Sequence, residues 1–178
     1  LSIVPGERVG IVGASGCGKT SIVRLLLRFY DPDEGTVRLG GHDLKDLPLS
    51  DIRKQIAVVN QDTYLFHGTI AENIRLGQPK ASDSQVIEAA KSANIQEFVS
   101  SLPQAYNSII GEKVIKLSGG QRQRIGIARA MAMEPEFIVA DEPVSSLDVS
   151  LQAQIINFFQ ALREKRGLTM ILISHDLA

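Results

Sequence analysis

A glycine-rich loop between an apolar strand and a helix is the feature that most constrains this chain. Residues 8–12, Arg-Val-Gly-Ile-Val, are short, apolar and β-branched, which predicts a buried strand. The loop 13–20, Gly-Ala-Ser-Gly-Cys-Gly-Lys-Thr, follows it, and residues 20–29 have the apolar spacing of a helix. Glycines let such a backbone curl until its N–H groups converge on an anion, and the helix adds the positive end of its dipole. The sequence therefore predicts a phosphate loop.

Two side chains of this loop suit a nucleoside triphosphate with Mg²⁺. Lys19 is expected to bridge the β- and γ-phosphates, and the Thr20 hydroxyl is expected to ligate Mg²⁺. The alternative is a glycine turn that only caps a helix, and the strand–loop–helix context disfavours it. Cys17 occupies a free position of the motif, and no redox role is expected for it. The candidate phosphate-binding residues are Gly13, Ala14, Ser15, Gly16, Cys17, Gly18, Lys19, Thr20 and Ser21.

An acidic pair ends another apolar strand. Residues 137–140, Phe-Ile-Val-Ala, run directly into Asp141 and Glu142. This order places two carboxylates at the carboxyl edge of a parallel sheet, where α/β proteins bind ligands. Alone, such a pair more often marks solvated charges at a strand end. In a chain that also has a phosphate loop, it predicts a role in Mg²⁺ binding and catalysis. Asp141 is then expected to hold Mg²⁺ through water, and Glu142 to act as general base on the attacking water.

Alternation of strands and helices predicts an α/β fold with a mostly parallel sheet. Besides the elements above, we expect strands over 36–39, 56–59 and 169–173, and helices over 71–76, 83–93, 96–102, 121–133 and 151–165. The stretch 68–132 has only helical patterns, which predicts an inserted helical subdomain. We expect one domain over 1–178, with a core of residues 1–60 and 134–178 and the helical subdomain over about 62–132.

Composition excludes several classes of protein. The net charge of −1, from 19 basic and 20 acidic residues, gives no broad nucleic-acid-binding face and no polybasic membrane anchor. Cys17 is the only cysteine, which excludes an intrachain disulfide and suits a reducing compartment. No apolar run approaches the ~20 residues of a transmembrane helix. Because few residues precede Gly13 and the chain stops directly after a motif, we expect a fragment of a longer protein.

The segment 117–121, Leu-Ser-Gly-Gly-Gln, opens a predicted helix. A serine and two glycines at a helix start can form a simple N-cap. They can also form a second anion site, in which Ser118 Oγ and free N–H groups point outward. The pentapeptide matches the signature motif of ABC (ATP-binding cassette) ATPases, and the other motifs follow that family's order over essentially the whole chain. The chain therefore resembles the nucleotide-binding domain of an ABC transporter.

This resemblance implies a P-loop NTPase core of the RecA-like type, an inserted α-helical subdomain and a truncated antiparallel β-subdomain. Gln61 matches the Q-loop glutamine, residues 145–148 (Ser-Ser-Leu-Asp) resemble the D-loop, and His175 resembles the switch histidine that contacts the γ-phosphate. The implied catalytic residues are Lys19, Gln61, Glu142 and His175. Beside the phosphate loop, the implied nucleotide-binding residues are Gln61, Ser118, Gly119, Gly120, Gln121, Asp141, Asp148 and His175. The implied Mg²⁺ ligands are Thr20, Gln61 and Asp141.

The resemblance also implies partners. ATP on the phosphate loop of one copy is expected to be capped by Ser118 and Gly120 of a second ABC domain, in a head-to-tail homo- or heterodimer. Transmembrane domains are expected to dock at Gln61 and at Gly111-Glu112, which places the chain at the cytoplasmic face of a membrane. The implied function is ATP hydrolysis that powers transport of an unknown substrate, and no nucleic-acid partner is expected.

Two departures from the family pattern stand out. The family stacks adenine on an aromatic residue upstream of the phosphate loop, and residues 1–12 contain none. Nucleotide affinity is therefore expected to fall by about one to two orders of magnitude. Residues 55–131 resemble exporter-type domains, whereas residues 141–178 resemble peptide-importer ATPases, so the chain has the pattern of a mosaic.

Two other functions are open to such a chain. A soluble ABC ATPase acting on nucleic acid or ribosomes is disfavoured, because the segment between Lys19 and Leu117 holds no heptads and is too short for the coiled coils of the DNA-repair members. A truncated nucleotide-binding module without activity is disfavoured because every catalytic position holds its expected residue.

Overall fold

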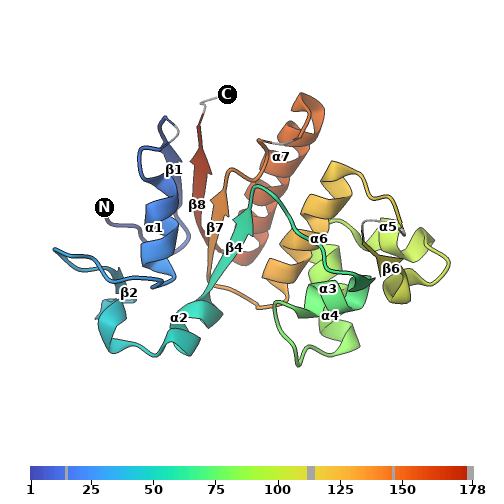
Figure 1. The fold of residues 1–178 in the computed structure, drawn as a ribbon, viewed down its shortest axis with the longest axis horizontal. Coiled ribbons are helices and arrows are strands. Elements are labelled where there is room, and N and C mark those ends of the chain that lie inside the picture. Colours follow the sequence, from blue (N-terminus) through green and yellow to red (C-terminus); the bar gives the residue numbers. More distant parts are fainter. Residues whose placement is uncertain (15, 112–114, 146, 176–178) are drawn as a thin grey trace.

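The computed structural model describes residues 1–14, 16–111, 115–145 and 147–175. Its centre is a four-stranded parallel sheet in the order β1-β8-β7-β4 (Figure 1). These strands are β1 (Arg8–Val12), β4 (Ile56–Asn60), β7 (Phe137–Asp141) and β8 (Thr169–Ser174). Each lies within one residue of its predicted bounds. The expectation that residues 8–12 are buried was wrong, because β1 is an edge strand whose residues alternate between exposed and half-buried. The predicted α/β class with a parallel sheet is confirmed.

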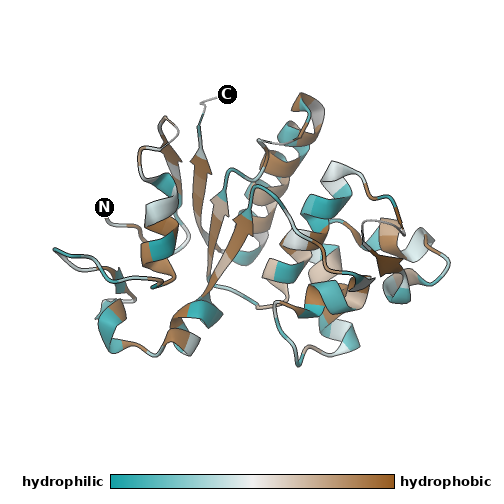
Figure 2. Ribbon diagram, viewed as in Figure 1, coloured by the Kyte–Doolittle hydropathy of each residue, from teal (hydrophilic) through white to brown (hydrophobic). Residues whose placement is uncertain are grey.

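Helices cover both faces of this sheet, and β7 shows how. Its successive side chains point to opposite faces. Phe137 and Val139 join a core with residues of α1 and α2, while Ile138 and Ala140 join a core with residues of α6 and α7. These helices are α1 (Lys19–Leu26), α2 (Leu49–Gln55), α6 (Gly119–Met131) and α7 (Val149–Arg166). Burial on both faces explains why the central strands are hydrophobic over most of their length (Figure 2).

A second group of elements packs around α6, beside the sheet (Figure 1). It holds α3 (Ile70–Arg75), α4 (Asp83–Ser92) and α5 (Gln96–Ser101), followed by a 3-10 turn at Ala105–Asn107. It also holds a two-stranded antiparallel ribbon of β5 (Gly68–Thr69) and β6 (Ile109–Ile110). The expectation of a purely helical stretch over 68–132 was therefore wrong. Two residues per strand are too few to show the period-two pattern by which a strand is predicted.

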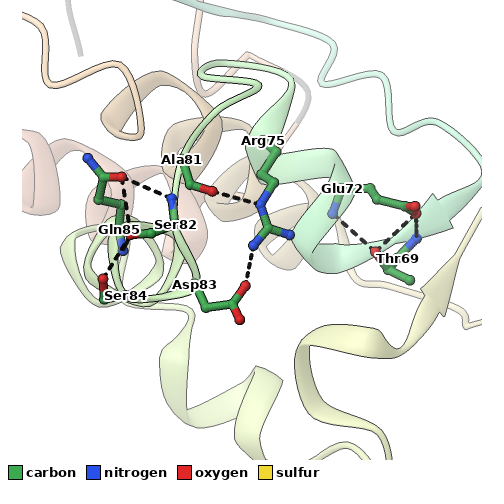
Figure 3. Close-up of polar contacts among 8 residues, drawn as sticks. All are labelled: Thr69, Glu72, Arg75, Ala81, Ser82, Asp83, Ser84 and Gln85. Atoms are coloured by element: carbon green, nitrogen blue, oxygen red, sulfur yellow. Dashed lines mark hydrogen bonds and ion pairs between the residues drawn. The ribbon is translucent and has the colours of Figure 1, made fainter.

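Capping boxes set where α3 and α4 begin (Figure 3). Thr69 Oγ1 accepts from Glu72 N at 3.1 Å, and Glu72 Oε2 accepts from Thr69 N at 2.7 Å. Ser82 and Gln85 repeat this exchange at the start of α4. Each box satisfies two N–H groups that lack a partner within the helix. The hydrogen bonds from the backbone and side chain of Thr69 also hold the pKa of Glu72 below its usual value.

The end of α3 is fixed by close contacts with its neighbours. Arg75 donates to Ala81 O and pairs with Asp83, which links α3 to the start of α4 (Figure 3). Gly77, just past α3, lies against α6: a Cβ added there would lie 2.0 Å from the carbonyl oxygen of Arg129. Only glycine permits this approach of the two backbones.

Some short elements differ from the predictions. The edge strand expected over 36–39 is β2 (Arg38–Leu39), and it pairs with an unpredicted strand, β3 (His42–Asp43). A 3-10 turn at Leu44–Asp46 and the helix α2 were not predicted either. The helix α2 fully buries only Ile52, too little apolar spacing to indicate a helix. Among the described residues, no helix has the length and apolarity needed to cross a membrane.

Candidate active site

The phosphate loop joins the end of β1 to the start of α1, as predicted. Gly18 is the N-cap of α1 with φ 97°, and Gly16 has φ 82°, both in the left-handed region that glycine adopts without strain. A Cβ added at Gly13 would lie 2.7 Å from Cys17 Sγ. The positions of these glycines are therefore required by the curl of the loop. Ser15 lies outside the described residues.

Lys19 lies inside this loop, with only 7% of its surface exposed. Its Nζ donates to the carbonyl oxygens of Gly13 at 2.7 Å and Ala14 at 3.2 Å. It also lies 3.7 Å from Glu142 Oε1. Three oxygens thus offset the cost of burying the cation. The compact ammonium group is thus held within the loop, as is expected of a phosphate-binding lysine.

Thr20 and Asp141 meet across the loop, although 121 positions separate them. Thr20 Oγ1 donates to Asp141 Oδ2 at 3.4 Å. Burial raises the pKa of Asp141; the Thr20 hydrogen bond opposes this shift, the Glu142 charge adds to it and the Lys19 charge opposes it. A hydroxyl beside a carboxylate fits Mg²⁺, which keeps several waters and takes its other ligands from phosphate oxygens. In the described part of the chain no cluster of three or more His, Cys, Asp or Glu could hold a metal alone.

Glu142 follows β7 in a strained conformation. Its φ of 48° is in the left-handed region, which costs a non-glycine residue about 1–2 kcal/mol. The turn is held because Glu142 N donates to Ile173 O at 3.0 Å, and Ser145 Oγ donates to Glu142 O at 3.0 Å. This backbone places the carboxylate between Lys19 and His175, whose Nδ1 lies 3.3 Å from Glu142 Oε2. Backbone strain of this kind is concentrated at functional sites.

The strand order explains why residues so distant in sequence converge. Because β8 lies between β1 and β7, Ser174 pairs with Val12 and Ile173 pairs with Asp141. His175, next after Ser174, therefore emerges between the phosphate loop and the acidic pair. On the other side of β7, Asn60 pairs with Asp141, so Gln61 leaves the sheet at the same edge.

Gln61 faces a neighbouring hollow. With Gly119, Arg122 and Leu147, it is among the residues that line an open hollow of about 340 Å³ beside the start of α6. The structure thus places Gln61 between the acidic edge of the sheet and the signature segment.

The signature segment forms the N-terminus of α6. Ser118 is the N-cap, and its Oγ accepts from Gln121 N at 3.2 Å while Gln121 Oε1 accepts from Ser118 N at 2.9 Å. Gln121 is therefore engaged at its own helix start, whereas Ser118 and Gly119 are exposed and Gly120 is buried. A Cβ added at Gly120 would lie 3.2 Å from Leu151 Cδ2 of α7. The predicted N-cap and the predicted anion site are compatible, because the serine hydroxyl keeps its proton to donate.

The signature and the phosphate loop of one chain do not meet. Figure 1 shows β8, β7 and α7 between the loop that precedes α1 and the start of α6. Asp148, predicted to bind nucleotide, is the N-cap of α7, with Oδ1 accepting from Leu151 N at 3.0 Å. Ser146 and Glu112, in the predicted D-loop and docking segment, lie outside the described residues. The roles of all these residues stay predictions.

Sequence reasoning missed a set of buried polar groups beside the site. Gln123 is 3% exposed and hydrogen-bonds to Thr63 and to the backbone of Asn60. Arg129 donates to Asn73 O and Tyr64 O, and burial lowers its pKa. The available signal was a glutamine in the buried stripe of α6, where an apolar residue is expected.

Comparison with known proteins agrees with this fold. A family model described as "ABC transporter" matches residues 1–145. The chain is 49% identical over 173 residues to the uncharacterized ABC transporter ATP-binding protein y4gM of Sinorhizobium fredii, covering 97% of this chain and 29% of that protein. It is 43% identical over 178 residues to a putative multidrug export ATP-binding/permease protein of Staphylococcus aureus, covering 100% of this chain and 30% of that one.

A solved structure described as a bacterial Atm1-family ABC exporter with ATP bound superposes with a TM-score of 0.86 at 40% identity. The match covers 99% of this chain and 30% of the chain in the solved structure. The fold and the loop define a P-loop nucleotide-binding domain. The chain belongs to the ABC transporter family, whose ATP-binding domains are ATPases. It spans less than a third of the length of these relatives.

Proposed function

We propose that this chain hydrolyses ATP as one half of a head-to-tail pair and so powers transport by membrane-spanning partners. The observation that carries the proposal is the position of Glu142. One of its carboxylate oxygens lies 3.7 Å from Lys19 Nζ, and the other lies 3.3 Å from His175 Nδ1. A carboxylate in this place is suited to accept a proton from the water that attacks the γ-phosphate.

The neighbouring residues take complementary roles. Lys19 exchanges its bonds to the loop carbonyls for contacts with the β- and γ-phosphates, and His175 hydrogen-bonds the γ-phosphate. Thr20 and Asp141 would hold Mg²⁺, and Gln61, which leaves the sheet at the same edge, would supply a further ligand. Bound Mg²⁺ supplies neutralisation of phosphate charge. The loop residues from Gly13 to Ser21 cradle the phosphates through their backbone.

We propose a head-to-tail pair because the phosphate loop and the signature segment, the two halves of the ATP site, lie apart in one chain. Ser118 caps the 13-residue helix α6 and is exposed, yet the start of this helix and the phosphate loop of the same chain lie apart, with β8, β7 and α7 between them (Figure 1). A second copy turned head to tail brings Ser118, Gly119, Gly120 and Asp148 onto the ATP of the first. The γ-phosphate then meets a helix N-terminus from each side, which stabilises its charge. Neither copy has a complete site alone.

The elements that pack around α6, namely α3, α4, α5, β5 and β6, form the proposed docking region for the transmembrane partner. We assign residues 1–60 and 134–178 to the core and about 62–132 to the helical subdomain. Beyond Gln61, Tyr64 and Phe66 are 68% and 52% exposed, and their rings meet edge to face at 4.9 Å. Gly111, after β6, belongs to the same region. These aromatic side chains offer the partner's cytoplasmic segment an apolar surface. Docking there places the chain at the cytoplasmic face of a membrane.

Relatives named for export support export as the direction. The resemblance of residues 55–131 to exporter-type domains and of residues 141–178 to peptide-importer ATPases stays a prediction.

Mixing two inactive copies tests the shared site. A Ser118→Arg copy keeps its phosphate loop, and a Lys19→Ala copy keeps its signature. Each alone is expected to be inactive, while the mixture regains part of the ATPase activity because one of its two sites is intact. If each chain hydrolysed ATP independently, the mixture would stay as inactive as its components.

A further inference from the structure

The turn that carries Gln61 is held at both ends by one buried side chain. Gln123 Nε2 donates to Asn60 O at 3.2 Å, and Gln123 Oε1 accepts from Thr63 Oγ1 at 2.8 Å. Asn60 and Thr63 flank Gln61 and Asp62, so the amide of Gln123 brackets the two residues between them. Both polar atoms of the amide have a partner, as burial to 3% exposure requires.

Burial of Gln61 and Asp62 cannot fix the turn, because both side chains are exposed. The two hydrogen bonds of the Gln123 amide, called the bracket below, therefore hold the turn in position relative to α6. Thr63 also packs directly on that helix: a Cβ added at Gly126 would lie 2.6 Å from Thr63 Oγ1. Hydrogen bonds of a buried amide are strengthened by the low local dielectric, and an amide left unpaired there is costly.

The same helix begins at Ser118, five positions before Gln123. An α-helix behaves as a rod over so short a distance, since each residue adds a fixed rise of about 1.5 Å. Gln61, Gly119 and Gln123 line one hollow, so the bracket and the helix start are neighbours. At its other end, the bracket reaches Asn60, the register partner of Asp141. The amide of Gln123 thus links the acidic edge of the sheet to the signature helix.

We propose that Gln123 is a positioning residue that couples Gln61 to Ser118. When a second copy's nucleotide engages Ser118, α6 is immobilised, and the bracket immobilises the Gln61 turn with it. This inference rests on the proposed function, because it needs a nucleotide shared between two copies. Gln123 itself touches neither nucleotide nor metal.

Hydrogen–deuterium exchange read by mass spectrometry tests the coupling, in the Glu142→Gln background that blocks turnover. Mg-ATP is expected to slow exchange both at residues 118–123 and at residues 61–66. Gln123→Met keeps the side-chain volume and removes both hydrogen bonds, and Thr63→Val removes one. With either change, the protection of 118–123 remains. The protection of 61–66 falls about tenfold, as expected for loss of a buried hydrogen bond.

Matched changes elsewhere control for the substitutions. Gln160→Met on the exposed side of α7 and Thr36→Val on the surface are expected to leave both protections unchanged. Thr63→Ser restores the hydroxyl and should restore the coupling, which a general loss of packing would not show. Circular dichroism checks that each variant folds. If Gln123→Met does not fold, Thr63→Val alone tests the coupling.

The outcomes separate the two proposals. Full protection of 61–66 in Gln123→Met and Thr63→Val would overturn the coupling while leaving the shared site intact. Loss of protection at both segments in the variants would also overturn it, since Gln123 would then act on the helix start itself. Absence of ATP-dependent protection at 118–123 in the parent would overturn the proposed function and this inference with it.

Discussion

Nδ1 of His175 lies 3.3 Å from Oε2 of Glu142, although the two residues follow different strands. The contact exists because β7 and β8 are adjacent and parallel, with Asp141 in register with Ile173. Lys19 approaches the other carboxylate oxygen from the far side of β8. The chemistry proposed for this chain depends on these three groups, and each can be tested separately.

Replacing His175 with alanine should slow turnover without preventing nucleotide binding. The imidazole is 54% exposed and contacts the carboxylate of Glu142, so its loss removes a γ-phosphate contact and leaves the phosphate loop intact. A fall in kcat of about 10²-fold is expected, measured by phosphate release. His42→Ala, on the exposed strand β3, is the matched control. Equal kcat in the His175 variant and the control would remove His175 from the mechanism.

Replacing Lys19 with alanine should weaken binding itself. Charge-assisted hydrogen bonds to phosphate are lost, so affinity for Mg-ATP is expected to fall about 10- to 100-fold. Calorimetric titration measures this affinity, and Lys54→Ala, a largely exposed lysine, should bind as the parent does. Unchanged affinity after Lys19→Ala would refute the phosphate-loop assignment.

Replacing Gly77 with alanine should destabilise the packing of α3 on α6. The added Cβ would lie 2.0 Å from Arg129 O, and backbone cannot move aside as a flexible side chain can. The free energy of unfolding is expected to fall by about 3 kcal/mol in denaturant titrations. At Gly10 an added Cβ has no neighbour within 4 Å, so Gly10→Ala should stay within about 1 kcal/mol of the parent. Similar stability of the two variants would contradict the close approach.

Tyr106 should make the fold sensitive to alkaline pH. Burial raises the pKa of its phenol from 10.0 to about 12, and the charge of Glu88 adds to the shift. Between these values the unfolded chain has released a proton that the folded chain keeps, so the free energy of unfolding falls as pH rises. Tyr106→Phe removes this contribution, and its stability should fall less steeply above pH 10.0. Tyr30→Phe should follow the parent; a Tyr106→Phe curve parallel to the parent's would contradict the assignment.

The elements that set the fold were predictable because each carries a local pattern. Residues 9–12 and 137–140 are short apolar runs, and the glycines that follow Val12 permit the left-handed backbone that the phosphate loop adopts. Short elements were missed for the converse reason. The strands β5 and β6 have two residues each and are defined only by pairing across some forty positions.

The site was predictable in its parts and not in its geometry. Lys19 and the acidic pair follow from motifs with a physical mechanism, whereas His175 was found through resemblance to a family. The bracket of Gln123 on Asn60 and Thr63 has no local signature, because it joins residues about sixty positions apart. A buried glutamine shows only that some partner exists, and the identity of that partner comes from the fold.

The shared nucleotide is tested most directly by the molar mass of the Glu142→Gln chain in solution. Blocking the base while keeping the shape of the side chain should leave ATP bound and unhydrolysed between two copies. Light scattering after gel filtration is expected to give twice the 19.4 kDa chain mass with Mg-ATP and the single-chain mass with Mg-ADP. A single-chain mass with both nucleotides, under conditions where titration shows ATP bound, would contradict the account.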